Sequence, residues 1–323
     1  MRSIPVVVAF LFLITLPAVA GEGFTFKDEA GKHMDVLQDG RIVARFMYEY
    51  DKSTPEKLHE TYKPYLHIFD HEGKAPVSKG PGGRYTHHRG IFIGYSRLGH
   101  GGKRYDRWHM KGGEQVHQKF IEQKAGATEA TLVSLVHWND AEGKPIVGEE
   151  RSFTFRVPPE GAYVMVDFVS KLKAPSGDVE LTGDPEHAGV QFRPANEVDA
   201  SKTVFVFPKE GADARKDLDY AWVGETFSLN DKLYSVVMMN HPDNPKKTRF
   251  SAYRDYGRFG AYPVATVKSG ECQFLKYRYV IAAGEMPSAE AIQKWCNSYT
   301  GASDPTPKTT VNAAQAKGKR KKK

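Results

Sequence analysis

The sequence predicts an all-β fold, a single large antiparallel β-sandwich with one short C-terminal helix. Between residues 24 and 281, short apolar or alternating runs recur that are rich in Val, Phe, Tyr and Thr. Clusters of Gly, Pro, Asn and Asp separate these runs, and such clusters favour turns. The spacing between runs leaves no room for crossover helices between parallel strands, so the pattern is typical of an antiparallel sandwich.

The strand candidates follow one another along most of the chain. Residues 151–157 alternate polar and apolar side chains, which places Phe153 and Phe155 on the same face of a strand. Turn sequences such as Gln38-Asp39-Gly40 lie between candidates. The candidates are residues 41–48, 65–69, 90–95, 116–122, 130–138, 151–157, 163–169, 203–207, 233–240 and 274–281.

One helix is expected at residues 288–299. Ser288 is a suitable N-cap, and Glu290 lies in the first turn, where a carboxylate favours the helix. Ile292 and Trp295 fall on one face, so the helix is expected to pack against the sheet. No repeat or linker interrupts residues 24–300, and we therefore expect one domain at residues 21–300.

Residues 1–20 have the features of a secretory signal peptide. Arg2 supplies the positive charge, residues 4–16 are almost wholly apolar, and Ala18-Val19-Ala20 is a small-residue cleavage site. We therefore expect cleavage near Ala20 and a periplasmic or secreted location. No other segment approaches the roughly 20 apolar residues of a membrane helix, so no membrane span is expected.

Cys272 and Cys296 are the only cysteines. An oxidising compartment permits a disulfide between them. Because the sequence does not give their separation, a disulfide and two free thiols both stay open.

The net charge of +7 comes from the ends of the chain. Six basic residues lie in 317–323 and Arg2 lies in the signal peptide, which leaves 39 of the 46 Lys and Arg residues against 39 Asp and Glu. The folded body is near neutral, so nucleic-acid binding by this body is not expected. Residues 301–323 lack hydrophobic periodicity and are expected to form a disordered basic tail able to contact acidic surfaces.

The stretch at residues 80–95 joins a glycine-rich loop to a strand and carries His87, His88 and Arg89. Nine of the twelve histidines lie between His59 and His137, so imidazoles are concentrated in this part of the chain. An imidazole can transfer protons near neutral pH, and an adjacent guanidinium can hold a hydroxyl or carboxylate. A purely structural role for this polar loop stays open, because long loops also use such residues to satisfy backbone groups.

Aromatic and polar residues gather again at residues 99–109, which include Tyr105, Trp108 and His109. An exposed aromatic ring can cover the C–H face of a sugar while neighbouring polar groups bind its hydroxyls. The segment therefore predicts a sugar platform at Trp108. The alternative is an insertion in which Trp108 plugs the domain.

Residues 186–193 follow a turn and enter a strand. Alternation places Gln191 and Arg193 on one face, and Glu186 lies just before the strand. A carboxylate near histidines can form an acid/base pair. A structural Glu–Arg ion pair is the alternative.

The signal for a metal site is weak. His67 and His71 are four residues apart, but a strand followed by a turn does not give them the geometry of a helix. The sequence has no HExxH or paired CxxC motif, and no phosphate-binding or dinucleotide-binding glycine motif. We expect no cofactor and assign no metal ligands, and a His-ligated metal ion stays open as an alternative.

Five segments, taken in order, resemble the DUF6807 family, which is also labelled the "methane oxygenase PmoA" family. They are Lys63-Pro64-Tyr65-Leu66-His67, His87-His88-Arg89-Gly90-Ile91-Phe92, Gly189-Val190-Gln191-Phe192-Arg193, Ala221-Trp222-Val223-Gly224 and Met239-Asn240-His241-Pro242-Asp243-Asn244-Pro245. The resemblance implies a sandwich similar to the supersandwich of galactose-mutarotase-like domains, in proteins of bacterial glycan-degradation systems. This chain departs from the family pattern at Tyr85-Thr86, where His-Pro is usual, so the resemblance leaves the catalytic roles open.

The leading hypothesis is an exported carbohydrate-active protein that binds a sugar or glycan on one sheet face and acts by epimerisation, elimination or glycoside cleavage. The candidate catalytic residues are His87, His88, His67, His117 and Glu186, and the candidate substrate-binding residues are Arg89, Arg193, Tyr65, Trp108, His109 and His241. These side chains are expected to converge in one cleft. The alternatives are a non-catalytic carbohydrate-binding module and a His-ligated metal oxidase.

Overall fold

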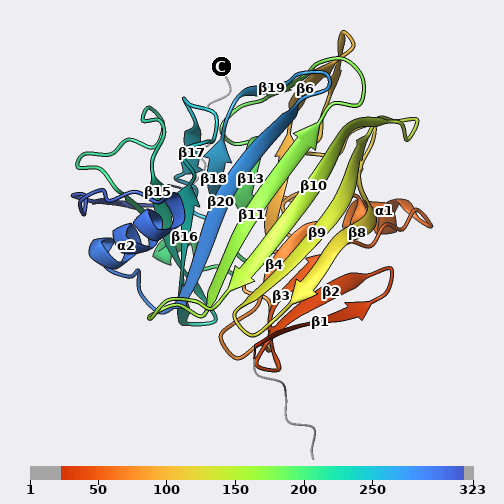
Figure 1. Cartoon of the computed structure of the whole chain (residues 1–323). Coiled ribbons are helices and arrows are strands. Elements are labelled where there is room, and N and C mark those ends of the chain that lie inside the picture. The colour runs from red at the N-terminus through yellow and green to blue at the C-terminus, as the bar shows by residue number, and fades with distance from the viewer. Residues whose placement is uncertain (1–22, 316–323) are drawn as a thin grey trace, which may run out of the picture.

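The computed structural model describes residues 23–315, and it consists of two large antiparallel sheets packed face to face (Figure 1). The eight-stranded sheet has the spatial order β1 (Phe24–Glu29), β2 (His33–Gln38), β3 (Arg41–Met47), β4 (Tyr65–Ile68), β5 (Ile91–Tyr95), β13 (Ala188–Phe192), β18 (Phe259–Tyr262) and β17 (Arg249–Ala252). This arrangement confirms the predicted all-β sandwich.

The nine-stranded sheet forms the other layer. Its spatial order is β21 (Thr310–Ala313), β14 (Val204–Phe207), β15 (Trp222–Leu229), β16 (Lys232–Asn240), β20 (Cys272–Ala283), β11 (Val164–Lys173), β10 (Pro145–Arg156), β9 (Glu129–Asn139) and β8 (Gln115–Ala125). A smaller four-stranded sheet has the order β19 (Ala265–Val267), β12 (Val179–Thr182), β6 (Arg97–His100) and β7 (Lys103–Tyr105).

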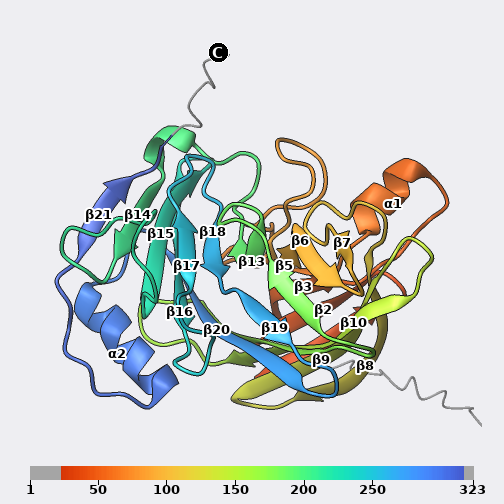
Figure 2. The same ribbon diagram turned by 90° about the horizontal axis from the view of Figure 1, so that it is seen from above.

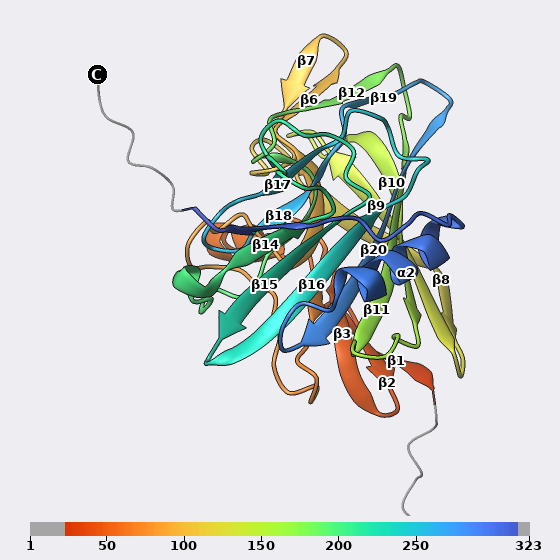
Figure 3. The same ribbon diagram turned by 90° about the vertical axis from the view of Figure 1, so that its left-hand side faces the viewer.

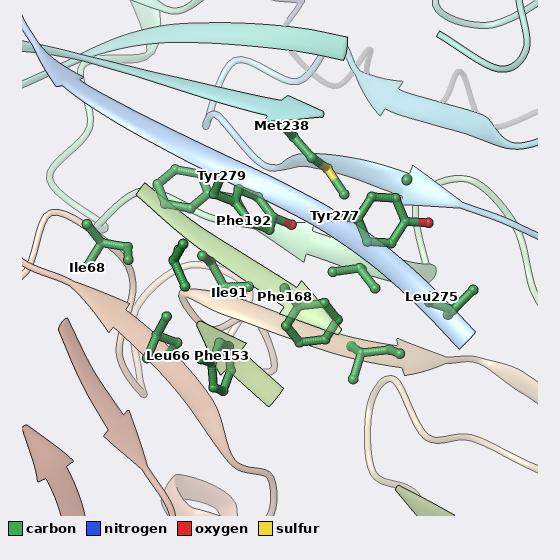
Figure 4. Close-up of a cluster of buried hydrophobic side chains, with 14 of the residues drawn as sticks. Leu66, Ile68, Ile91, Phe153, Phe168, Phe192, Met238, Leu275, Tyr277 and Tyr279 are labelled. Carbon is green, nitrogen blue, oxygen red and sulfur yellow. The ribbon is translucent and has the colours of Figure 1, made fainter. Parts of the chain in front are cut away.

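The main core lies between the two large sheets (Figure 4). Alternate residues of β10 and β11 point inward, and Phe153 packs against Phe168 with ring centroids 5.5 Å apart. From the eight-stranded sheet, Leu66 and Ile91 enter the same cluster. Strand alternation, which the sequence shows, therefore selects the buried face.

In the described part of the chain, two α-helices and a short 3-10 helix at Ala200–Lys202 accompany the sheets. The predicted C-terminal helix is confirmed as α2 (Ala289–Thr300), capped by Ser288, and its Ile292 packs with Trp222 on the outer side of the nine-stranded sheet (Figure 3). The sequence analysis missed α1 (Pro55–Thr61), because this seven-residue helix buries no side chain and so has no apolar stripe.

The chain after α2 differs from the expectation. Residues 301–315 do not form part of a disordered tail, because β21 pairs with β14 at the edge of the nine-stranded sheet (Figure 2). A strand at the edge of a sheet can pair through its backbone without alternating apolar side chains, so the composition of residues 301–315 did not indicate this strand. The signal peptide and the basic cluster at 317–323 lie outside the described residues.

Two further expectations concern the cysteines and the membrane. Cys272 is exposed, Cys296 is buried, and both are free thiols, so they do not form a disulfide. Within residues 23–315, no helix is long and apolar enough to cross a membrane.

The outer face of the eight-stranded sheet carries a second, smaller apolar cluster. Tyr65 on β4 and Phe92 on β5 point away from the main core and pack with Trp108. Long loops cover this face, and the loop between β4 and β5, orange in Figure 2, lies on the side of the sheet away from β9 and β20. The histidine-rich segments are in these loops.

Candidate functional site

Four histidines gather over the outer face of the eight-stranded sheet. The ring of His87 lies 4.4 Å from that of His88 and 4.4 Å from that of His109, measured between centroids. The ring of His109 in turn lies 5.4 Å from that of His187. Three loops separated in sequence therefore supply the cluster, which we call the histidine site (His87, His88, His109 and His187).

The end of β5 holds two of these loops in place. The backbone N–H of Arg107 donates to the carbonyl of Tyr95 at 2.8 Å, and the N–H of Ser96 donates to the carbonyl of His187 at 3.0 Å. Because β5 pairs with β13 and β6 pairs with β12, the loop between β12 and β13 returns to the same place. His109 and His187 are thus brought together by sheet topology.

Each of these two histidines is bonded to an aspartate three residues earlier. Asp106 accepts a hydrogen bond from Nδ1 of His109 at 2.8 Å, and Asp184 accepts one from Nδ1 of His187 at 2.8 Å. Asp106 also accepts from the backbone N–H of His109 at 2.9 Å, which closes a tight turn. The sequence carried this signal as two Asp-x-x-His segments, and the sequence analysis did not use it.

The carboxylates of the two pairs favour their charged form. Burial alone would raise the pKa of Asp106, but the hydrogen bonds and charge of His109 outweigh it and lower this pKa to about 2. Burial would also raise the pKa of Asp184, but the hydrogen bond from His187 outweighs burial and lowers this pKa. Each carboxylate holds a proton on Nδ1 of its imidazole and leaves Nε2 as the acid or base atom.

Exposure divides the histidine site into two levels. The side chains of His109 and His187 are 28% and 34% exposed, whereas His88 is only 2% exposed. Nε2 of His87 and Nδ1 of His88 are buried and have no hydrogen-bond partner among the described residues. Burial lowers the pKa of His87 to about 2, and the charges of Lys63, His109 and His187 add to this effect, so His87 stays neutral.

Trp108 lies beneath the histidines and is not a sugar platform. It is 0% exposed and packs on Phe92 with ring centroids 4.9 Å apart. Lys63 fixes its backbone by donating from Nζ to the Trp108 carbonyl at 2.7 Å. The prediction of an exposed ring is wrong, because the ring fills the outer apolar cluster. The alternative, in which Trp108 plugs the domain, is confirmed.

Arg89 and Arg193 are also buried. Arg89 is 0% exposed and donates to the carbonyls of His88 and His59, both at 2.8 Å. Arg193 is also buried and donates to the carbonyls of Pro194 and Tyr256. Both guanidiniums donate to backbone carbonyls, so in this structure they hold loops in place, and their predicted contact with substrate stays a prediction.

Tyr65 and His67 form a buried pair on β4. Nε2 of His67 lies 3.3 Å from the Tyr65 hydroxyl, and Nδ1 lies 3.1 Å from Oγ of Ser78. Both ring nitrogens are occupied and neither side chain belongs to the histidine site. A cavity of about 160 Å³ borders Tyr65, together with Met47, Glu60, Lys63 and Pro81.

Three further candidates have their contacts outside the four histidines of the site. His117 is on β8 of the other sheet, with Nδ1 2.7 Å from Oγ of Ser134. Glu186 forms an ion pair with Arg254, as the alternative interpretation of this segment had it. His241 packs on Tyr299 of α2, with ring centroids 5.3 Å apart. The expected convergence of all candidates is wrong, and of these candidates only His87, His88, Trp108 and His109 meet.

Replacing His67 by glutamine is expected to reduce the loss of stability on acidification. Burial first, and then the charges of Arg45 and Arg89, lower the pKa of His67 to about 3 in the folded protein. In the unfolded chain this pKa is about 6.5. Between these values the unfolded state binds a proton that the folded state does not.

The contribution of neutral His67 is therefore complete above pH of about 6.5 and is lost as the pH falls toward 3, by at most about 1.4 kcal/mol per pH unit. Urea unfolding at neutral and mildly acidic pH should show a smaller difference for His67→Gln than for the wild type. The exposed His71, changed to Gln, is the control. Equal pH dependence in wild type and His67→Gln would contradict the expectation.

The described residues show no ready-made metal site. Among residues 23–315, no group of three or more His, Cys, Asp or Glu side chains is placed to hold a metal ion. Of the residues that make up this cluster, the sequence analysis did not select His187, Asp106 and Asp184. Tyr85 and Tyr256 also border the site, with ring centroids 5.3 Å and 6.0 Å from His88.

Several solved structures are similar to this chain. The heparan sulfate lyase HepC mutant from Pedobacter heparinus matches with a TM-score of 0.42 and 11% identity, over 82% of this chain and 37% of that chain. A β-arabinopyranosidase matches with a TM-score of 0.38 and 11% identity, over 75% of this chain and 38% of that chain. The Slr1438 protein from Synechocystis sp. PCC 6803 matches with a TM-score of 0.38 and 12% identity, over 85% of this chain and 100% of that chain. The chain thus spans well under half the length of the lyase and of the arabinopyranosidase.

Sequence comparison gives the family. No curated protein matches this chain. The family model described as "Family of unknown function (DUF6807)" matches residues 33–296, which include all four histidines of the site and nearly the whole of both large sheets. This chain therefore belongs to the DUF6807 family.

Proposed function

We propose that this chain is an exported carbohydrate-active protein that transfers protons at a bound sugar through His109 and His187. The observation that carries the proposal is the pair of Asp–His hydrogen bonds, each 2.8 Å long, on two partly exposed rings whose centroids are 5.4 Å apart. An aspartate on Nδ1 orients the imidazole and stabilises its protonated form. Two such imidazoles side by side can act as a base and an acid.

The proton balance is the same for the reactions considered. In an epimerisation, one Nε2 takes a proton from a sugar carbon and the other returns one to the opposite face. In an elimination, the base takes the carbon-bound proton, the C–O bond breaks, and the acid protonates the departing oxygen. In a glycoside cleavage, the base takes a proton from attacking water and the acid protonates the leaving oxygen.

The surroundings of the two rings suit a sugar. Tyr85 is partly exposed and packs on Tyr256 with ring centroids 4.6 Å apart, next to His88. Aromatic faces beside hydrogen-bonding groups match the mixed surface of a pyranose. The sequence resemblance to proteins of glycan-degradation systems supports the same substrate class.

Turnover on a panel of oligosaccharides tests the proposal through four variants. His109→Gln and His187→Gln are each expected to lower turnover by about a hundredfold or more, because each removes an acid/base group. Asp106→Asn and Asp184→Asn should also lower turnover strongly while preserving the fold, because an amide favours the wrong tautomer. The pH profile should change in these two variants.

Asp140→Asn is the matched control. Asp140 closes a similar turn by accepting from the backbone N–H of Lys144 at 2.8 Å, but no histidine is bonded to it. This variant is expected to keep wild-type turnover. Unchanged turnover in both histidine variants would refute the acid/base roles, and sugar binding without any product would favour a non-catalytic binding module.

A second candidate is a histidine-ligated metal centre. Histidines that bind metals commonly donate their other N–H to a carboxylate, as His109 and His187 do here. Nε2 of His87, which has no hydrogen-bond partner among residues 23–315, is on the neighbouring ring, although the three rings do not form a preformed metal site. Elemental analysis separates the candidates, because copper, iron or zinc at one equivalent per chain in the wild type, and its loss in His109→Ala, would favour the metal centre.

A further inference from the structure

We propose that the histidine site takes an acidic sugar, one that carries a carboxylate or a sulfate group, and that Arg84 binds this group. The inference rests on the proposed function, because it names the substrate class of the same site. Both acidic groups present two or more oxygens to a guanidinium, which is the shared chemistry.

Arg84 is an exposed guanidinium that is already held in place. Its Cζ lies 5.0 Å from the ring centroid of Tyr85 and 5.2 Å from that of Tyr256. Its Nη2 lies 3.4 Å from the Tyr85 hydroxyl. Stacking on two rings already restricts the Arg84 side chain, so binding an anion would cost less conformational entropy. The N–H groups of the guanidinium stay accessible. Within residues 23–315, no carboxylate forms an ion pair with it.

The same two rings connect Arg84 to the histidines. The ring of Tyr85 lies 5.3 Å from that of His88. The ring of His87 lies 4.4 Å from that of His88 on one side and 4.4 Å from that of His109 on the other. Arg84 therefore stands at one edge of the histidine site. An anion bound there would belong to a sugar unit whose other atoms lie over the imidazoles.

Buried cations behind Tyr256 add to the attraction for an anion. Arg193 lies 5.0 Å from the centroid of the Tyr256 ring. Arg258 is fully buried and donates to neutral partners, Oε1 of Gln191 at 2.7 Å and Oγ of Ser251 at 2.9 Å. A positive field in a poorly hydrated region attracts negative charge.

The nearby carboxyl groups do not cancel this field. Glu186 is used by Arg254. Glu225 is fully buried, and within residues 23–315 neither of its oxygens has a hydrogen-bond partner. Burial raises the pKa of Glu225 well above its usual value, against the charges of Arg193 and Arg258, so this group favours its neutral form. Asp106 and Asp184 are bonded to His109 and His187, so the guanidiniums on the Tyr256 side of the site are the groups left to attract an anion.

Isothermal titration calorimetry with the full chain tests the inference with matched pairs of probes. One pair is a trigalacturonate and its carboxyl-reduced, neutral counterpart, and the other is a dextran sulfate oligosaccharide and the unsulfated dextran oligosaccharide. The acidic member of at least one pair is expected to bind about tenfold tighter or more. The pair that shows this preference identifies carboxylate or sulfate as the group recognised.

Arg84→Gln should weaken binding of that acidic probe on the order of ten- to a hundredfold and leave the neutral probe unchanged. Arg84→Lys, which keeps the charge but not the fork, should give an intermediate affinity. Arg215→Gln is the matched control, because Arg215 is also exposed and lies 3.9 Å from the ring centroid of Tyr253. This control is expected to bind like the wild type.

Three results would overturn the inference: equal binding of acidic and neutral probes, equal effects of the Arg84 and Arg215 variants, or no binding of either acidic probe. Failure of the proposed function looks different. If acidic probes bind through Arg84 but turnover is the same in wild type, His109→Gln and His187→Gln, the acid/base roles fail and the anion site stands. If the histidine variants lose turnover but Arg84→Gln still binds the acidic probe more tightly than the neutral one, the anion site fails and the acid/base roles stand.

Discussion

Replacing Glu149 by alanine is expected to destabilise the folded protein by about 3–5 kcal/mol, because it leaves a buried charge without its partner. Glu149 and Arg151 are both fully buried on β10, and Nη2 of Arg151 donates to Oε2 of Glu149 at 2.6 Å. Arg151 also donates from Nη1 to the Pro64 carbonyl at 2.7 Å, which ties the two large sheets together. Denaturant unfolding at constant pH measures the loss.

Glu149 supports two further donors in the same layer. Nε1 of Trp138 donates to it at 2.7 Å, and Oγ of Ser170 donates to it at 2.7 Å. In Glu149→Ala these donors are also left buried and unsatisfied, which adds to the destabilisation. The double variant Glu149→Met with Arg151→Met removes both charges and is expected to recover part of the lost stability.

The neighbouring residue supplies the control. Glu150 lies on the opposite face of β10 and pairs with Lys171 at 3.0 Å, where both side chains are substantially exposed. Glu150→Ala is expected to change the free energy of unfolding by no more than about 1 kcal/mol. If Glu149→Ala costs no more than Glu150→Ala, the buried network does not hold the sheets together.

Gly94→Ala is expected to destabilise the protein by about 1–3 kcal/mol or more and to impair the histidine site as well. A Cβ on Gly94 would lie 2.2 Å from the carbonyl oxygen of Arg107 and 3.2 Å from Cα of Trp108. Neither backbone atom can move away unless the loop that carries Asp106 and His109 moves with it. Hydrogen exchange of residues 106–113 should therefore become faster, and turnover should fall.

Gly148→Ala is the matched control for this change. Gly148 also lies within a strand, β10, but a Cβ there would meet no atom within 4 Å. Because alanine narrows the unfolded ensemble, the control is expected to be neutral or to stabilise by about 0.4–1 kcal/mol. Equal stability and equal exchange in the two variants would show that the loop does not depend on close contact with β5.

Prediction from the sequence succeeded where structure is determined locally. The alternation at residues 151–157 and the capping residue Ser288 identified β10 and α2, because these signals depend on side chains close in sequence. Fully buried strands such as β15 and β18 were not identified, since a strand buried on both faces shows no alternation.

The candidate site was predicted only in part, because its residues come from segments that are far apart in sequence. His87, His88 and His109 stood out through residue type and glycine-rich surroundings. His187 joins them because its loop is carried back by the pairing of β12 with β6 and of β13 with β5. We expected Arg89 and Trp108 to be accessible, because charged and aromatic residues often are. In the structure Arg89 is buried against backbone carbonyls, and Trp108 is buried in the outer apolar cluster.

By itself, the sequence determined the sandwich class, the C-terminal helix and the histidine-rich loop before β5, since alternation, capping and turn chemistry act over a few residues. The tertiary structure alone decided which imidazoles meet and which cations remain exposed. Both depend on strand pairings between residues far apart along the chain and on burial, and no local pattern records either of them.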